Sequence, residues 1–136
     1  MRRNGILVVL ALAATMVVGV SAAFAAKRYT THIVFLGNSG PSLQDQTLYG
    51  DLNTNPKCGG ARQLRLFKKT STGFKLVDVD LSSFNGAWAL RADLTGTPDL
   101  VVQVTREKRS RGRVVCKPAA LRLTPEPGAA KYSRAS

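Results

Sequence analysis

Two cysteines, Cys58 and Cys116, are the residues of this 136-residue chain whose chemistry is most sharply defined. A secreted chain with two cysteines normally joins them, so we predict a single Cys58–Cys116 disulfide. The bridge would close a loop of about 59 residues, which the chain-entropy model values at about 4 kcal/mol. Zinc is the rival use of two cysteines, but it would need two further ligands, and His32 is the only histidine.

A run of cations lies just before and after the second cysteine. If the run forms a hairpin, its side chains gather at one end of a sheet, where they could bind phosphate or carboxylate groups with strong salt dependence. No aromatic residue alternates with these charges, which argues against base stacking and against a dedicated nucleic-acid site. The alternative is a solvated turn that blunts strand pairing. The candidate anion-binding residues are Arg106, Lys108, Arg109, Arg111, Arg113 and Lys117.

Catalytic and metal motifs are not found. The sequence has no Gly-x-Ser-x-Gly elbow, no Gly-rich phosphate loop and no His-Glu-x-x-His, and it shows no cofactor motif. Asp78 and Asp80 share one face of an expected strand and are interpreted as surface residues. The D-x-N-x-N run at 51–55 resembles the start of a calcium loop, but Pro56 and Arg62 stand where such a loop needs glycine and glutamate. We interpret the run as a strand end and an Asx-rich turn, and we predict a non-catalytic chain without cofactor or metal.

The first 25 residues have the pattern of a signal peptide. Arg2 and Arg3 precede an uncharged apolar stretch over 6–20, and a small-x-small pattern follows. We predict cleavage after Ala25, or alternatively after Ala26, and secretion of the mature chain. The competing interpretation is an uncleaved anchor, because a stretch of about 20 apolar residues can span a bilayer.

The mature chain is predicted to be one strongly basic domain over 26–124, followed by a disordered tail over 125–136. Without Arg2 and Arg3, the chain carries 18 Lys and Arg against 8 Asp and Glu, a net charge of +10. Such a charge favours anionic partners: an acidic polysaccharide, a cell-wall or other extracellular polymer, phospholipid head groups or nucleic acid. The alternative is that the charge only keeps a secreted protein soluble.

Short β-favouring segments separated by turn residues every 8 to 12 positions, with no helical period, predict an all-β fold. We expect a seven- or eight-stranded antiparallel β-sandwich, with Leu64, Leu66 and Trp88 in the core and Arg62 at an edge or facing out. Gly50 is a possible bulge, and the shift of phase after Phe74 predicts a bulge or an edge. The expected strands span 29–36, 46–52, 61–69, 74–81, 87–94, 100–104, 114–116 and 120–124, and 37–42 is expected to be a loop.

Aromatic residues support a second hypothesis for function. Trp88, Tyr49 or Phe84 could stack on sugar rings, which would require at least two exposed and coplanar rings. Trp88 lies on the apolar face of its expected strand, however, and a core position explains it more simply. A protein-partner or inhibitor loop is the other alternative, since such loops carry no recognisable motif.

A series of short motifs occurs in a fixed order along the chain: Tyr49-Gly50-Asp51, Cys58, Arg62-x-Leu64-x-Leu66-x-Lys68, Gly86-x-Trp88, Gly96, and Cys116 followed by Ala119-Ala120. This order resembles one known family, the small secreted bacterial domains with a prealbumin-like (transthyretin-like or carboxypeptidase-regulatory-like) β-sandwich. The resemblance covers about 47–124, and it implies a non-catalytic module with no catalytic residues to transfer. The chain departs from the pattern at Gly96-Thr97-Pro98, where a Gly-x-Tyr pair is usual, and immunoglobulin-like and fibronectin-like sandwiches stay open.

Overall fold

The computed structural model describes residues 25–128 and 130–135, so the predicted signal peptide lies almost wholly outside the described residues. Within them the chain is all-β, as predicted, with eleven short strands and one turn of 3-10 helix. The elements are β1 (Lys27–Tyr29), β2 (Thr31–Ser42), β3 (Asp45–Thr54), η1 (Pro56–Cys58), β4 (Gln63–Thr70), β5 (Gly73–Leu81), β6 (Ala87–Ala92), β7 (Leu100–Val104), β8 (Glu107–Arg109), β9 (Val114–Cys116), β10 (Ala119–Pro125) and β11 (Tyr132–Arg134).

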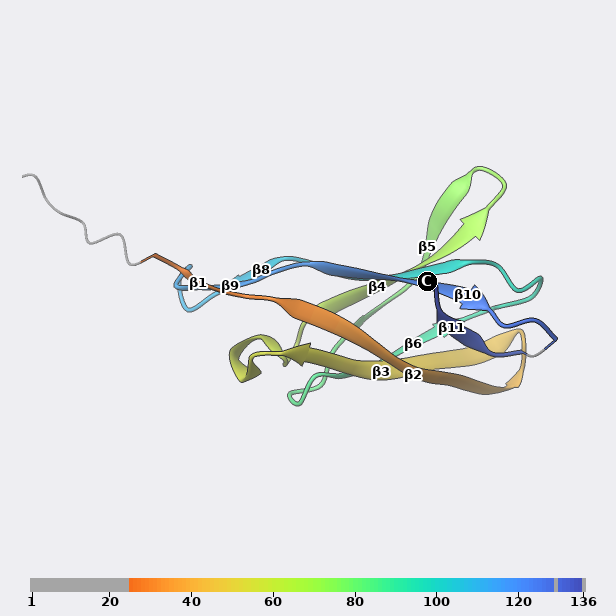
Figure 1. Cartoon of the computed structure of the whole chain (residues 1–136), viewed down its shortest axis with the longest axis horizontal. Coiled ribbons are helices and arrows are strands. Elements are labelled where there is room, and N and C mark those ends of the chain that lie inside the picture. Colours follow the sequence, from red (N-terminus) through yellow and green to blue (C-terminus); the bar gives the residue numbers. More distant parts are fainter. Residues whose placement is uncertain (1–24, 129, 136) are drawn as a thin grey trace, which may run out of the picture.

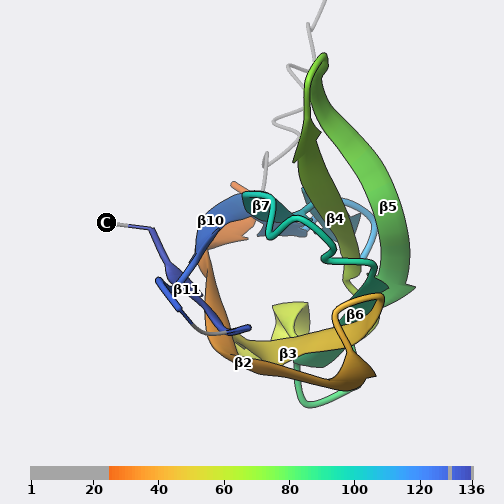
Figure 2. The same cartoon turned by 90° about the vertical axis from the view of Figure 1, so that its right-hand side faces the viewer.

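The strands form two large sheets and one small one. The orders are β2-β3-β6, β11-β10-β7-β4-β5 and β1-β9-β8. The two larger sheets face each other, and seen end-on their strands surround a common interior (Figure 2). The small sheet lies at one end of the elongated molecule (Figure 1). The predicted all-β, disulfide-bonded fold class is confirmed. It differs from the expected arrangement in two details: among the described residues there are eleven strands instead of seven or eight, and β1 pairs with β9 in parallel.

The interior is filled by alternate residues of the facing strands, as the period of two along a strand requires. Leu64 and Leu66 of β4 are fully buried, and Trp88 of β6 is 4% exposed, which confirms the predicted core positions. Each large aliphatic side chain removed from water contributes about 1.5–3 kcal/mol. The remaining buried apolar residues of this core are Ile33, Leu48, Leu52, Leu90, Leu94, Leu100, Val102, Val104, Leu121, Leu123 and Tyr132.

Gly50 is required by the way Trp88 packs. A Cβ atom at Gly50 would lie 1.9 Å from the carbonyl oxygen of Val34 and 2.7 Å from Cζ2 of Trp88. The indole can therefore cross β3 only where β3 has no side chain. The expected bulge is displaced onto the neighbouring strand, because the register of β2 against β3 shifts between Phe35 and Gly37, opposite Gly50.

Side chains close both seams between the two large sheets. On one side Oδ2 of Asp78, in β5, accepts a 2.7 Å hydrogen bond from the backbone N–H of Arg91 in β6. On the other side Asn38 of β2 donates from Nδ2 to the carbonyl of Ala130 and accepts at Oδ1 from the N–H of Tyr132. β5 is the edge strand of its sheet, and its register shifts opposite Leu66, as the change of phase predicted.

Two segments expected to be irregular are strands. β2 runs through the predicted loop at 37–42, because bulges let Gly37–Ser42 keep pairing with β3. The tail expected to be disordered from Pro125 onward pairs with β10 through β11, and Tyr132 is only 5% exposed. Its hydroxyl donates a 2.7 Å hydrogen bond to the carbonyl of Pro98. One buried aromatic ring therefore anchors a segment whose polar composition predicts disorder.

The predicted disulfide joins Cys58 to Cys116, with 5.6 Å between the Cα atoms. Both cysteines are fully buried, and together with Val114 and the partly buried Tyr29 they form a second, smaller core. The bridge ties η1 to β9 and so connects the small sheet to the sandwich.

Replacing Tyr132 tests the docking of β11. Burial raises the pKa of Tyr132 to about 12, and Asp99 acts in the same direction. Because this value is above the unfolded pKa of about 10, the contribution of the phenol to stability is complete below about pH 10 and is lost as the pH approaches 12. Tyr132→Phe should therefore cost about 1 kcal/mol at neutral pH, from the lost hydrogen bond, and this difference should vanish at alkaline pH.

Denaturant melts at several pH values and titration of the tyrosinate absorbance would measure both effects. If every tyrosine in the folded wild-type protein ionised near pH 10, the docked position of Tyr132 would be wrong.

Candidate anion-binding site

The cations that were singled out by sequence lie at the end of the molecule formed by the small sheet. β8 and β9 form the expected hairpin, in which Arg109 pairs with Val114. Its turn contains consecutive residues with positive φ at Ser110, Arg111 and Gly112. Arg106 and Lys117 flank the hairpin on either side, and all the predicted cations except Arg109 are exposed.

Three further cations join this group from distant parts of the chain. β1 brings Lys27 and Arg28, because it pairs in parallel with β9. Lys57 lies in η1, next to the disulfide. Sequence reasoning missed them, although the predicted disulfide could have found Lys57, which immediately precedes Cys58 just as Lys117 immediately follows Cys116. We call the complete group the basic end: Lys27, Arg28, Lys57, Arg106, Lys108, Arg109, Arg111, Arg113 and Lys117.

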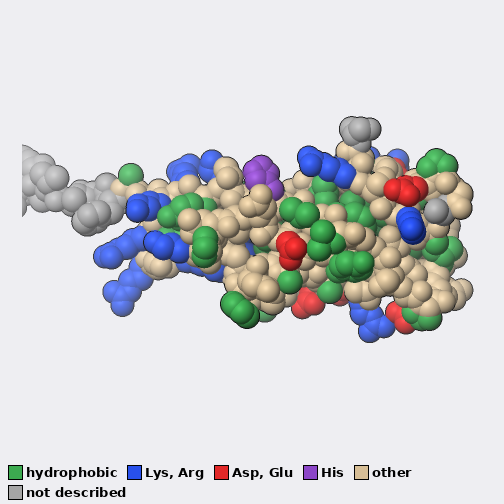
Figure 3. Space-filling view, turned by 60° about the horizontal axis from the view of Figure 1, so that its bottom comes forward, with side chains coloured by type: hydrophobic (Ala, Val, Ile, Leu, Met, Phe, Trp, Pro, Cys, Tyr) green, Lys and Arg blue, Asp and Glu red, His purple; other side chains and the backbone are tan. Residues whose placement is uncertain are grey.

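The charges of the protein are strongly segregated. The basic end contains nine cations and one carboxylate, that of Glu107, whereas the rest of the described residues contain nine cations and seven carboxylates. Eight of the ten net positive charges therefore lie at one end. Figure 3 shows Lys and Arg side chains gathered beside the small sheet, with the Asp and Glu side chains of this face farther along the molecule. Such an arrangement concentrates the positive potential on a small part of the surface.

Arg109 has a structural role. Its guanidinium bonds both oxygens of Glu107, at 3.1 and 3.2 Å, and donates to the carbonyl oxygens of Lys57 (2.9 Å) and Gly60. The side chain is therefore half-buried and holds β8 against the segment that follows η1. The sequence prediction that Arg109 binds an anion is thus the least supported of the set.

A groove lies between β1, η1 and the β8–β9 turn. Its volume is about 430 Å³, and it is lined by Ala25, Lys27, Lys57, Ser110, Arg113 and Val114. Among the described residues, three cations and one hydroxyl group border it, and no carboxylate does. These are the groups that phosphate and carboxylate ligands require, since ammonium and guanidinium groups donate hydrogen bonds to anionic oxygens.

Arg62 lies beneath the basic end and is fully buried, so its predicted exposed or edge position is wrong. Nη1 donates to Oγ1 of Thr31 and to the carbonyl of Cys58, both at 3.1 Å. Nη2 donates to the carbonyls of Thr105 and Lys117, both at 3.0 Å. Four of the five N–H groups of the guanidinium are therefore satisfied by four separate segments of the chain.

The fifth N–H of Arg62, at Nε, faces Oε2 of Glu107 at 3.6 Å, which is an ion pair without a hydrogen bond. Burial lowers the pKa of Arg62, the carboxylate of Glu107 opposes this, and Arg109 adds to it. The group remains charged at neutral pH, because an arginine does not lose its proton in proteins. Glu107 is thus shared between Arg62 and Arg109, and it is not available to neutralise the exposed cations.

The three aromatic residues proposed for a sugar platform lie on three separate elements. Trp88 is buried and its indole N–H donates to the carbonyl of Asp51, so it cannot stack on a ligand. Tyr49 is 40% exposed on β3, opposite Gly37 and Ala89. Phe84 is 89% exposed on the loop between β5 and β6.

The remaining candidate residues occupy unrelated places. His32 is exposed on β2. Asp78 and Asp80 accept hydrogen bonds from the backbone N–H groups of the residues directly after them. Asn55 caps η1 through Oδ1, as an Asx-rich turn predicts. In residues 25–128 and 130–135, no three His, Cys, Asp or Glu side chains gather as a metal site.

The described part of the chain is therefore a disulfide-bonded, sandwich-like β domain with a cationic end. Comparison with protein-family models, with curated proteins and with solved structures finds no match. Among the described residues, no helix is both long and apolar enough to span a membrane.

Arg62 should be essential for the attachment of the basic end. Arg62→Met keeps an unbranched, largely apolar side chain but removes the guanidinium nitrogens, so the three carbonyls and the hydroxyl of Thr31 lose their donor. Since each buried group left without a partner costs about 1–3 kcal/mol, the free energy of unfolding should fall by at least about 3 kcal/mol. Arg62→Lys should recover little, because an ammonium cannot reach across all four acceptors.

Arg122→Met is the matched control, because Arg122 is exposed on β10, and it should change the unfolding free energy by less than about 0.5 kcal/mol. Urea denaturation measures all three variants. A loss below about 1 kcal/mol in Arg62→Met would contradict this role.

Proposed function

We propose that this protein is a secreted, non-catalytic β-sandwich module that binds anionic cell-wall or extracellular polymer through its basic end. The observation that carries the proposal is the segregation of charge: eight of ten net positive charges lie on the small sheet and its flanking loops. A charge needed only for solubility could be spread over the whole surface.

The shape of the site favours an extended anion. Lys27, Lys57 and Arg113 line one groove, and Arg106, Lys108 and Lys117 lie outside it on the same end. A linear polyanion could contact both sets at once, and each neutralised phosphate or carboxylate would release counterions. At about 0.15 M salt the Debye length is about 8 Å, so only charges close to the polymer contribute.

The fold supports a place outside the cell. The buried Cys58–Cys116 bridge is the kind of crosslink that persists in oxidising compartments. Together with the signal-peptide pattern of the N-terminus, it supports secretion. The resemblance to prealbumin-like domains stays a prediction. If it holds, it would support a non-catalytic role.

Other partners fit the geometry less well. A sugar platform would need two coplanar exposed rings. Of the three rings proposed for it, Trp88 is buried, and Tyr49 and Phe84 lie on different elements. A nucleic-acid groove would need aromatic rings between its cations, yet Tyr29, the aromatic residue of β1, packs against the disulfide.

The test compares two triple variants with the same change of net charge. In Lys27→Gln/Lys57→Gln/Arg111→Gln the basic end loses three cations, while Arg109 and its structural contacts stay intact. The control is Lys69→Gln/Lys75→Gln/Lys131→Gln, since these three lysines are exposed on other parts of the molecule. Binding of labelled polyphosphate and poly-L-glutamate, with dextran as the neutral polymer, is followed by fluorescence anisotropy over a range of salt concentrations.

We expect the wild-type protein and the control to bind at about 0.15 M salt, and the first variant to bind at least about tenfold more weakly. The slope of log K against log salt should also fall by about two, at 0.7–0.9 per lost contact. Equal weakening of both variants would mean that only net charge matters. If the wild-type protein does not bind at this salt concentration, the proposal is wrong and the positive charge serves solubility.

A further inference from the structure

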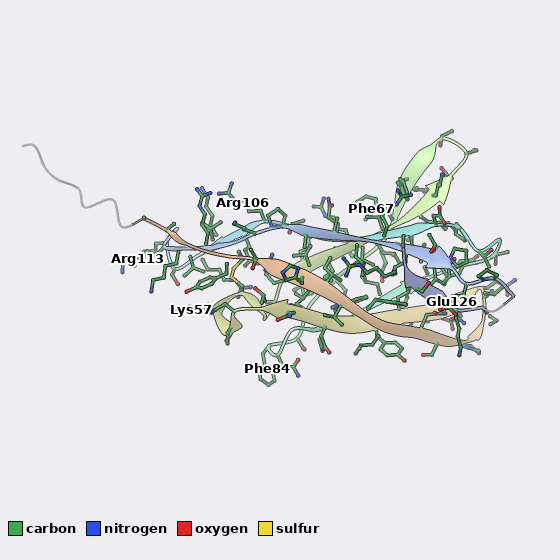
Figure 4. All side chains as sticks on the ribbon, viewed as in Figure 1. Lys57, Phe67, Phe84, Arg106, Arg113 and Glu126 are labelled. Atoms are coloured by element: carbon green, nitrogen blue, oxygen red, sulfur yellow. A yellow bond between two sulfur atoms is a disulfide. The ribbon has the colours of Figure 1, made fainter. Side chains whose placement is uncertain are left out.

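Phe84 is the most exposed large apolar side chain among the described residues, at 89% of its full surface. It lies at the tip of the loop between β5 and β6 and points away from the sandwich (Figure 4). A phenyl ring held in water is unfavourable because apolar surface is hydrated at a cost in free energy. A single exposed apolar residue is ordinary on a protein surface. Whether Phe84 has a function must therefore be argued from its position and from the order of its loop.

The loop that carries Phe84 is firmly held. The N–H of Ser83 donates to the carbonyl of Ala87 at 2.8 Å, and the N–H of Gly86 donates back to Ser83 at 2.9 Å. Oδ1 of Asn85 accepts from both the hydroxyl of Ser83 and the N–H of Ala87. The N–H of Leu52 in β3 donates to the carbonyl of Gly86 at 2.9 Å. The ring is therefore presented on an ordered loop, which lowers the entropy cost of binding.

The same loop packs directly against the basic end. A Cβ atom at Gly60 would lie 3.0 Å from Cα of Phe84, so the backbone of the loop lies against the segment just after η1. The guanidinium of Arg109 holds the same region, through the carbonyl of Lys57 in η1 and the carbonyl of Gly60 after it. In Figure 4, Lys57 lies between Phe84 and the end of the molecule where Arg113 is found.

We propose that the basic end and Phe84 together dock on the surface of an anionic lipid bilayer, with the ring entering the region between head groups and acyl chains. Such a surface offers negative charge and apolar material side by side, and proteins that lie on it combine Lys and Arg with exposed aromatic or aliphatic residues. A soluble polyanion would use the cations and leave Phe84 in water. The inference rests on the proposed function, because the same cations provide the electrostatic attraction.

The test uses vesicle co-sedimentation of the protein recovered after secretion from an expression host, with its N-terminus determined by mass spectrometry. Vesicles of phosphatidylcholine containing about one third phosphatidylglycerol are compared with pure phosphatidylcholine at about 0.15 M salt. Phe84→Ser should reduce binding to the anionic vesicles about tenfold while leaving polyphosphate binding unchanged. Leu36→Ser is the matched control, because Leu36 is an exposed apolar residue of β2, at 59%, and it should bind like the wild-type protein.

A fluorescent variant reports insertion directly. In Phe84→Trp the new indole should shift its emission to shorter wavelength on anionic vesicles, against the constant background of the buried Trp88. Undiminished vesicle binding by Phe84→Ser, or an unshifted emission of Phe84→Trp, would overturn the membrane inference and leave the polymer proposal standing. Failure of the wild-type protein to bind both polyphosphate and anionic vesicles would overturn the two together.

Discussion

The buried guanidinium of Arg62 is the interaction on which the arrangement of this molecule depends. Its four hydrogen bonds reach the start of β2, the end of η1, the residue after β7 and the residue after β9. At three of these points, Thr31, Thr105 and Lys117, the chain passes between the sandwich and the small sheet, and Cys58 is joined to the small sheet by the disulfide. The small sheet has little apolar core of its own, only the cluster around the disulfide. Arg62 and the Cys58–Cys116 bridge therefore hold it in place together, one by hydrogen bonds and the other by a covalent crosslink.

The hydrogen-bond partners of Arg62 affect the net charge of the basic end, which lies above it. A carboxylate beside a buried cation would offset part of the cost of burying the charge, but it would also cancel a positive charge. Here the donors are satisfied mainly by carbonyl oxygens, which carry no net charge, and the one nearby carboxylate, Glu107, is shared with Arg109. Glu107 is thus occupied by these two buried or half-buried guanidinium groups, and the basic end carries a large excess of positive charge. The mutual repulsion of its cations must be balanced by the rest of the fold, and the disulfide does so independently of salt and pH.

Sequence patterns predicted the features that depend on local physical chemistry. Four features were predicted correctly because each depends on neighbouring residues or, for the disulfide, on the number of cysteines. They are the burial of Leu64 and Leu66, the burial of Trp88, the pairing of the cysteines and the edge position of β5. Arg62 was misplaced for the same reason: it directly precedes a strand in which apolar and basic residues alternate, and nothing local distinguishes a buried guanidinium from an exposed one. Its acceptors are backbone carbonyls, which exist at every position and leave no mark in the sequence.

Contacts between distant segments also left no mark. Lys27 joins the β8–β9 hairpin because β1 pairs with β9, and Lys57 joins it through Arg109 and the disulfide. Tyr132 is docked by hydrogen bonds with Asn38 and Pro98. The basic end is assembled from three such segments, which meet because one chain segment serves two sheets: β1 pairs with β9, and after Thr30 the same segment continues as β2 and pairs with β3. Inspection of the sequence finds only the densest run of cations, at 106–117. It does not show that β1 and η1 lie beside this hairpin and form a groove with it. The exposure of Phe84 also could not be predicted, because the sequence does not show whether an aromatic residue in a turn is buried or exposed. Its proposed role in binding depends on two features of the structure: the ordered loop that exposes the ring, and the cations of the basic end nearby.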